Sequence, residues 1–176
     1  MPPNLALQSD SRAIVGALGA LYMMWLQLNA NVSHARAMTR SLGQLSEQTL
    51  QSASFNGDTK EWVFVFSGGV GLRVSAPWRI VAHGQIALGW QDDGHSFGLQ
   101  MPIDATERLG ALIHGRRIAS ASVSLSGDLA IDFGGDSTLE IFNASCGYEG
   151  WQLQGPGQRW TIAQGGGNVL ESDHDG

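Results

Sequence analysis

One predicted hairpin constrains the fold of this chain more than any other feature. In residues 129–133 (LAIDF) and 138–142 (TLEIF), apolar side chains alternate with smaller or polar ones. Successive side chains of a strand point to opposite faces, so each run predicts a strand with one apolar and one mostly polar face. The intervening Gly134-Gly135-Asp136-Ser137 supplies residues that tolerate positive φ, as a tight hairpin requires. The pattern predicts a β-meander over residues 118–154.

The same pattern occurs earlier in the chain and indicates an internal duplication. Phe66 precedes Phe133 by 67 positions, and at this shift Leu72 falls on Leu139 without a gap. Residues 50–55 resemble 118–123 after a slip of one position. Self-similarity at a fixed period is typical of one structural unit used twice. Two units are too few for an open solenoid, so we expect them to pack on each other around one core.

These patterns predict a mainly β (α+β) fold of two similar antiparallel β-meander units, covering about 50–102 and 116–167. The first unit includes a predicted strand at His95–Gln100. A short helix links the units, because Asp104 to Glu107 resembles a capping box and Gly115 follows the helical pattern. The predicted organisation is an N-terminal helical appendage (1–48), a duplicated β-rich domain (49–170) and a disordered acidic tail (171–176).

The N-terminal segment contains the most apolar run, Ala13–Leu28, and it lacks strand alternation. Three interpretations stay open. As a transmembrane helix the run is short, since about 20 apolar residues are needed to cross a bilayer. As a signal peptide it lacks a clearly positive leading region. As a soluble helix it requires a partner surface, because it is apolar on nearly all sides. Residues 31–48 predict a second, more polar helix.

Charge distinguishes the two predicted units. Residues 118–154 contain five carboxylates and no Lys or Arg, whereas residues 50–86 contain two carboxylates and three cations. Patches of one sign attract partners of the other sign. We therefore expect an acidic, partner-facing surface and a basic protein partner. The candidate partner-binding residues are Asp132, Asp136, Glu140 and Glu149.

The sequence contains no recognisable catalytic, cofactor or metal motif. Its five histidines are scattered, Gly165-Gly166-Gly167 lacks the context of a phosphate loop, and Cys146 is the lone cysteine. We expect a non-enzymatic protein with no cofactor. A net charge of −6 argues against nucleic-acid binding. Four residues are expected to be structural: Trp78, Phe133, Tyr148 and Trp151.

Several strings of the chain resemble a small bacterial family of unknown function. They are Leu72-Arg-Val, Pro77-Trp78-Arg79-Ile80, residues 127–133, Leu139-Glu-Ile, the string Tyr148-Glu-x-Trp151-x-Leu153 and a terminal Gly-Gly. The resemblance covers roughly residues 50–167, and the Tyr-Glu-x-Trp string is its most specific part. It implies a short β-rich protein. Some members lie near contact-dependent or secreted toxin genes and are considered immunity proteins. Residues 1–48 have no counterpart, and the resemblance implies no catalytic residues.

Three functions follow as competing hypotheses. The first is an immunity-type protein that neutralises a cognate toxin by covering its active site. The second is a structural protein that forms a homo-oligomer through Ala13–Leu28. The third is a binder of small molecules or carbohydrates, or a hydrolase, that uses Trp90, Trp151 or Trp160 with a carboxylate. The expected location is cytoplasmic, or exported or membrane-anchored if Ala13–Leu28 is a signal or anchor segment.

Overall fold

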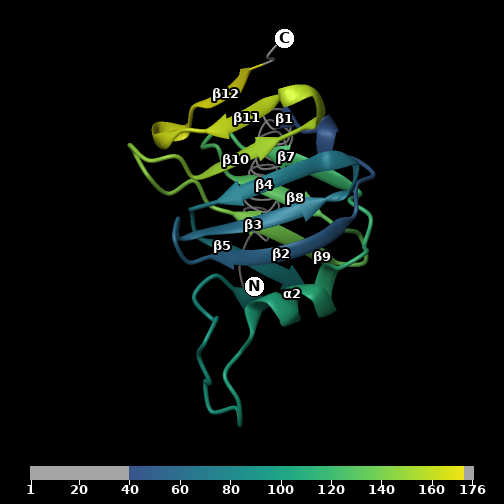
Figure 1. Cartoon of the computed structure of the whole chain (residues 1–176), viewed down its shortest axis with the longest axis vertical. Coiled ribbons are helices and arrows are strands. Elements are labelled where there is room, and N and C mark those ends of the chain that lie inside the picture. Colours follow the sequence, from purple (N-terminus) through teal and green to yellow (C-terminus); the bar gives the residue numbers. More distant parts are fainter. Residues whose placement is uncertain (1–39, 173–176) are drawn as a thin grey trace, which may run out of the picture. The chain divides into compact units, whose positions relative to one another are not determined.

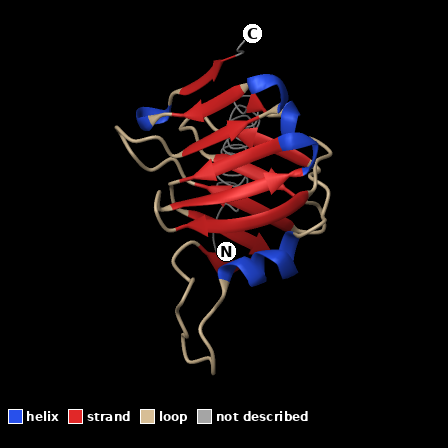
Figure 2. Ribbon diagram, in the orientation of Figure 1, coloured by secondary structure: helices blue, strands red, loops and turns tan. Residues whose placement is uncertain are grey.

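The described part of the chain, residues 40–172 of a computed structural model, forms two six-stranded antiparallel sheets (Figures 1 and 2). The prediction of a mainly β fold is confirmed. One sheet has the strand order β1-β7-β8-β9-β5-β6 and the other β12-β11-β10-β4-β3-β2. The strands are β1 (Arg40–Ser41), β2 (Leu50–Asn56), β3 (Glu61–Phe66), β4 (Val70–Val74), β5 (Trp78–Ala82), β6 (Gln85–Gly89), β7 (Ser120–Val123), β8 (Leu129–Asp132), β9 (Ser137–Ile141), β10 (Trp151–Gln154), β11 (Trp160–Ala163) and β12 (Val169–Ser172).

Each sheet is built from both halves of the chain. The meander β2-β3-β4 of the first half lies beside the hairpin β10-β11 of the second. Conversely, the meander β7-β8-β9 of the second half lies beside the hairpin β5-β6 of the first. Each half thus contributes a three-stranded meander to one sheet and a hairpin to the other, and the two halves differ in which sheet receives the meander. This arrangement is the packing around one core that a duplicated unit favours.

The strand registers follow the same relationship. In the first half Trp62 lies opposite Val74 across β3 and β4. In the second half Leu129 lies opposite Ile141 across β8 and β9. These are the positions that the shift of 67 residues pairs in the sequence. The alternating apolar pattern therefore specified the register of both hairpins, as expected where one face of each strand is buried.

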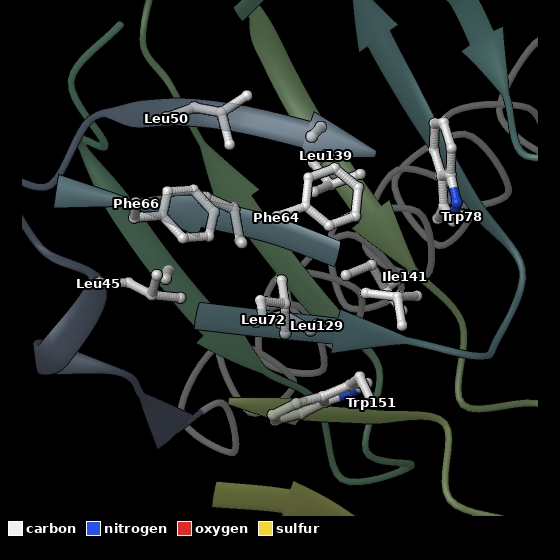
Figure 3. Packing of buried hydrophobic residues seen from close by; sticks show 14 of the residues in the cluster. Leu45, Leu50, Phe64, Phe66, Leu72, Trp78, Leu129, Leu139, Ile141 and Trp151 are labelled. Carbon is white, nitrogen blue, oxygen red and sulfur yellow. The ribbon is translucent and has the colours of Figure 1, made fainter. Parts of the chain in front are cut away.

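The core lies between the two sheets, where Figure 3 shows Phe64, Phe66 and Leu72 from one sheet with Leu129, Leu139 and Ile141 from the other. Three of the predicted structural residues belong to this core: Trp78, Phe133 and Trp151 are all buried. Trp78 packs edge-on against Trp62, with 5.0 Å between their ring centroids. Edge-on aromatic pairs of this kind add stability beyond the area they bury.

The predicted linker helix is confirmed as α2 (Ala105–Ile113). Asp104 is its N-cap, and the side-chain carboxylate accepts a hydrogen bond from the Glu107 N–H at 2.9 Å. Leu109 and Ile113 are buried, so the apolar face of the helix packs on the sandwich. Gly115 follows the helix with φ +70°, a conformation that favours glycine.

Three sequence predictions are wrong at the level of elements. Residues 40–48 are not helical but form β1 and the 3₁₀ turn Gly43–Leu45, because Leu42 and Leu45 are buried in the core. His95–Gln100 forms turns of a loop rather than a strand. Glu171 and Ser172 belong to β12 rather than to a disordered tail.

The other N-terminal predictions fall outside the described residues, among them those for Ala13–Leu28. Among the residues that the structure describes, no helix is long and apolar enough to cross a membrane.

Candidate functional site

The structure places three of the four predicted partner-binding carboxylates on the β8–β9 hairpin. The Asp132 carboxylate accepts a hydrogen bond from the Gly134 N–H at 2.7 Å, so it shapes the turn that follows it. Asp136 is exposed at the tip of the hairpin, and its carboxylate lies 4.0 Å from Nδ1 of His83. Asp136 also has φ +62°, which Asp tolerates better than most residues.

Glu140 forms an ion pair on the outer face of this sheet. Its carboxylate lies 2.6 Å from Nε of Arg79, which is directly opposite on β5. The Arg79 guanidinium also lies 5.1 Å from the centroid of the Phe142 ring. Because β5 comes from the other half of the chain, a cation from the nearly neutral unit offsets a carboxylate of the acidic unit. The outer face of this sheet is therefore of mixed charge.

Glu149 is separated from the other three carboxylates. It lies in the connection between β9 and β10, which begins at the opposite end of β9 from Asp136. Its carboxylate accepts a hydrogen bond from the Gln152 side chain at 2.5 Å. The neighbouring Tyr148, which was expected to be structural, is 82% exposed and lies outside the core that contains Trp78, Phe133 and Trp151.

The connections that carry each half from one sheet to the other meet at this end of the sandwich. The backbone N–H groups of Ser75 and Ala76 both donate to the Gly150 carbonyl, at 3.1 and 3.0 Å. The Ser75 hydroxyl donates to the Glu149 carbonyl at 2.7 Å. We call this region the crossover end. Two open cavities border it, and Ser75 and Ala76 line both.

The first cavity, which we call the aromatic cleft, has a volume of about 750 Å³. Four aromatic side chains line it: Phe55, Trp62, Trp90 and Phe97. Phe55 and Trp62 are tilted by 48° with 5.7 Å between centroids. Its polar lining includes Lys60, Asp93 and His95. The volume of the cleft is within the range of small-molecule sites, and such sites are typically lined by apolar and aromatic side chains.

The second cavity, of about 820 Å³, is lined by Tyr148 and Glu149 and otherwise by small side chains and backbone. Its walls are the two connections themselves. It brings two of the predicted site residues together, although Tyr148 serves there as an exposed surface residue.

The loop between β6 and α2 projects from the sandwich beside the helix (Figures 1 and 2). Leu99 and Met101 are exposed on it, and they line a groove of about 280 Å³ against α2 together with Glu107 and Arg108. We call this surface the loop–helix groove. Phe97 of the same loop lines the aromatic cleft instead.

Among the described residues, no group of three or more His, Cys, Asp or Glu side chains could hold a metal ion. Of the three Trp residues proposed for a ligand site, only Trp90 lines the aromatic cleft, while Trp151 is buried. Sequence reasoning missed Phe55, Lys60 and Phe97. For Phe97 the available signal was the apolar content of residues 95–101, a segment that Gly98 interrupts and that Gly94 and Pro102 flank, so a loop was the better prediction than a strand.

Comparisons with known proteins support the resemblance to a family of unknown function. No curated protein and no solved structure matches the chain. Residues 41–171 match the model of the DUF6188 family, a family of unknown function, and the chain therefore belongs to that family.

Proposed function

We propose that this protein is a non-enzymatic binding protein whose partner is a basic protein, with toxin neutralisation as the biological role. The exposed apolar side chains of the loop–helix groove carry the proposal. Leu99 is 54% and Met101 74% exposed. Large apolar side chains that are grouped on a projecting loop favour a role in contacting another protein.

The charges around the groove favour a basic partner. Asp104 and Glu107 lie at the N-terminal end of α2, and Arg108 is the one cation among the residues that line the groove. A protein interface typically has apolar anchors at its centre and a polar rim. Toxin neutralisation is the role that the family resemblance implies, and the acidic residues Asp132, Asp136 and Glu149 would assist attraction at longer range.

A coexpression experiment tests this function. The neighbouring open reading frame is expressed alone and then with the full-length protein, and growth is measured. We expect a basic product that arrests growth alone and is neutralised by the wild type but not by a Leu99→Ser/Met101→Ser variant. Leu170→Ser, on β12 and also half-exposed, is the matched control and should still neutralise.

The direct contact is measured with the two purified proteins by calorimetry. We expect binding to weaken at higher salt, and to weaken further in an Asp132→Asn/Asp136→Asn variant. The proposal would be contradicted by a neighbouring gene product that is harmless. It would also be contradicted by a toxin that the Leu99→Ser/Met101→Ser and Leu170→Ser variants neutralise equally.

A further inference from the structure

The aromatic cleft departs from the arrangement in the other half of the sandwich. Phe55 on β2 lies opposite Trp62, and Val123 on β7 lies opposite Leu129. Because the repeat pairs Trp62 with Leu129, Phe55 and Val123 occupy corresponding positions. Val123 is 2% exposed, whereas Phe55 is 45% exposed. The first half therefore keeps a large aromatic side chain open to solvent at a position that the second half buries.

The indole N–H groups differ in the same way. Nε1 of Trp151 donates to the Gly127 carbonyl at 2.8 Å, and Gly127 packs against Asn143. Nε1 of Trp78 is buried and has no hydrogen-bond partner in the described part of the chain. Trp78 lies directly behind Trp62, a wall of the cleft. In the second half the turn that contains Gly127 supplies an acceptor for the indole N–H. In the first half the described residues supply no such acceptor for Trp78.

The walls of the cleft suit a flat ring. Phe55, Trp62, Trp90 and Phe97 come from β2, β3 and the loop after β6, so aromatic surfaces face the cleft from several elements. His95 stacks on Phe97 with 5.5 Å between centroids and 27° between ring planes. The Ile103 N–H donates to the His95 carbonyl at 2.9 Å, which ties the two sides of the loop together. A planar aromatic ligand could stack on or meet the edges of these rings.

The charges in the cleft favour an anionic group. Lys60 lines it and forms no ion pair within the described residues. Asp93 also lines it, but its carboxylate accepts a hydrogen bond from the Ala105 N–H at 2.9 Å and thus faces the first turn of α2. The hydrogen bond directs this carboxylate toward α2, so the Lys60 ammonium is the charged group that can contact a ligand.

We propose that the aromatic cleft binds a small planar aromatic acid, with its ring among Trp90, Phe97 and Phe55 and its anionic group on Lys60. A saccharide is the competing ligand, since Gln91 and His95 also line the cleft and could bind hydroxyl groups; the four aromatic side chains and Lys60 favour the aromatic acid. The site is independent of the loop–helix groove.

Two fluorescent probes of similar shape test the assignment on the full-length protein. Anilinonaphthalene sulfonate carries an anionic group, and phenylnaphthylamine is its uncharged relative. We expect saturable one-to-one binding of the sulfonate. Lys60→Met should weaken binding of the sulfonate by roughly twofold to fivefold, which is the range of one exposed charge contact, and leave binding of the neutral probe unchanged.

Removal of the walls should weaken both probes. Trp90→Ala and Phe97→Ala should each reduce both affinities by roughly tenfold, as expected for an aromatic stacking contact. The matched control is Leu170→Ala, an exposed apolar side chain on β12, and it should bind both probes like the wild type. Unfolding midpoints measured in urea show that each variant is folded.

The proposal is overturned if Trp90→Ala and Lys60→Met bind both probes like the wild type, or if Lys60→Met affects both probes equally. Cellobiose that displaces the sulfonate at equal concentration would assign the cleft to saccharides instead, which also overturns it. The Leu99→Ser/Met101→Ser variant should bind both probes normally, so failure of the protein-binding function and failure of the cleft are distinguishable.

Discussion

Trp78 and Trp151 occupy equivalent places in the two halves of the sandwich, since Trp78 lies opposite Ile141 and Trp151 lies opposite Val74. Val74 and Ile141 are themselves paired by the repeat in the sequence. Both indoles are 1% exposed. Only the Trp151 indole N–H has a hydrogen-bond acceptor among the described residues. The duplicated framework thus contains a difference of one buried hydrogen bond.

That difference predicts unequal effects of the same substitution. Trp151→Phe should lower the free energy of unfolding by about 1–3 kcal/mol more than Trp78→Phe, because it leaves the buried Gly127 carbonyl without its donor. The loss of ring volume is the same in both variants and cancels in the comparison. Urea unfolding followed by circular dichroism measures both values. An equal or larger loss in Trp78→Phe would refute the comparison.

The ion pair between Arg79 and Glu140 predicts a small, salt-dependent coupling. Both side chains are about a third exposed or more, at 40% and 32%, so we expect a coupling of less than about 1 kcal/mol in a double-mutant cycle of Arg79→Met and Glu140→Gln. Salt at about 1 M should reduce it further. Arg79→Met should cost more than Glu140→Gln, since Arg79 also contacts Phe142. A coupling that does not change with salt would contradict this account.

The hairpins were predictable because alternation is a local property of the chain. Trp62 opposite Val74 and Leu129 opposite Ile141 follow from the apolar pattern and the glycine turns alone. The charge of a face was not predictable in this way. The charged residues of 118–154 do not include Arg79, and only the fold shows that β5, which carries Arg79, lies beside β9.

The aromatic cleft could not be predicted for the same reason. Phe55 and Trp62 lie on β2 and β3, far in the sequence from Trp90 and Phe97 in the loop after β6, and the two groups meet only in the folded chain. Tyr148 was expected to be structural, but it is exposed in an irregular connection before β10, where strand alternation carries no information.

Two carboxylates satisfy backbone N–H groups in the first turn of α2, and each predicts a measurable loss. Asp104 caps Glu107, and Asp93 accepts from Ala105. Asp104→Ala and Asp93→Ala should each lower the free energy of unfolding by about 1 kcal/mol, the usual cost of losing such a cap. Asp58→Ala, an exposed carboxylate in the β2–β3 turn, is the control and should change stability by less than about 0.5 kcal/mol. Equal effects in all three variants would show that net charge, and not capping, is responsible.

Two glycines predict opposite effects of the same Ala substitution. Gly110 lies inside α2, and a Cβ there would meet no atom within 4 Å, so Gly110→Ala should stabilise the protein by about 1 kcal/mol through helix propensity. At Gly165, by contrast, a Cβ would lie 2.6 Å from the backbone carbonyl carbon of Cys146. Gly165→Ala should therefore destabilise the protein by about 1–3 kcal/mol, because the turn must move away from the connection that contains Cys146.

The midpoint of urea unfolding measures both changes. The Gly165→Ala variant should also bind the sulfonate probe like the wild type, since Gly165 does not line the aromatic cleft. Stabilisation by Gly165→Ala would mean that the two backbone segments are not in close contact in solution.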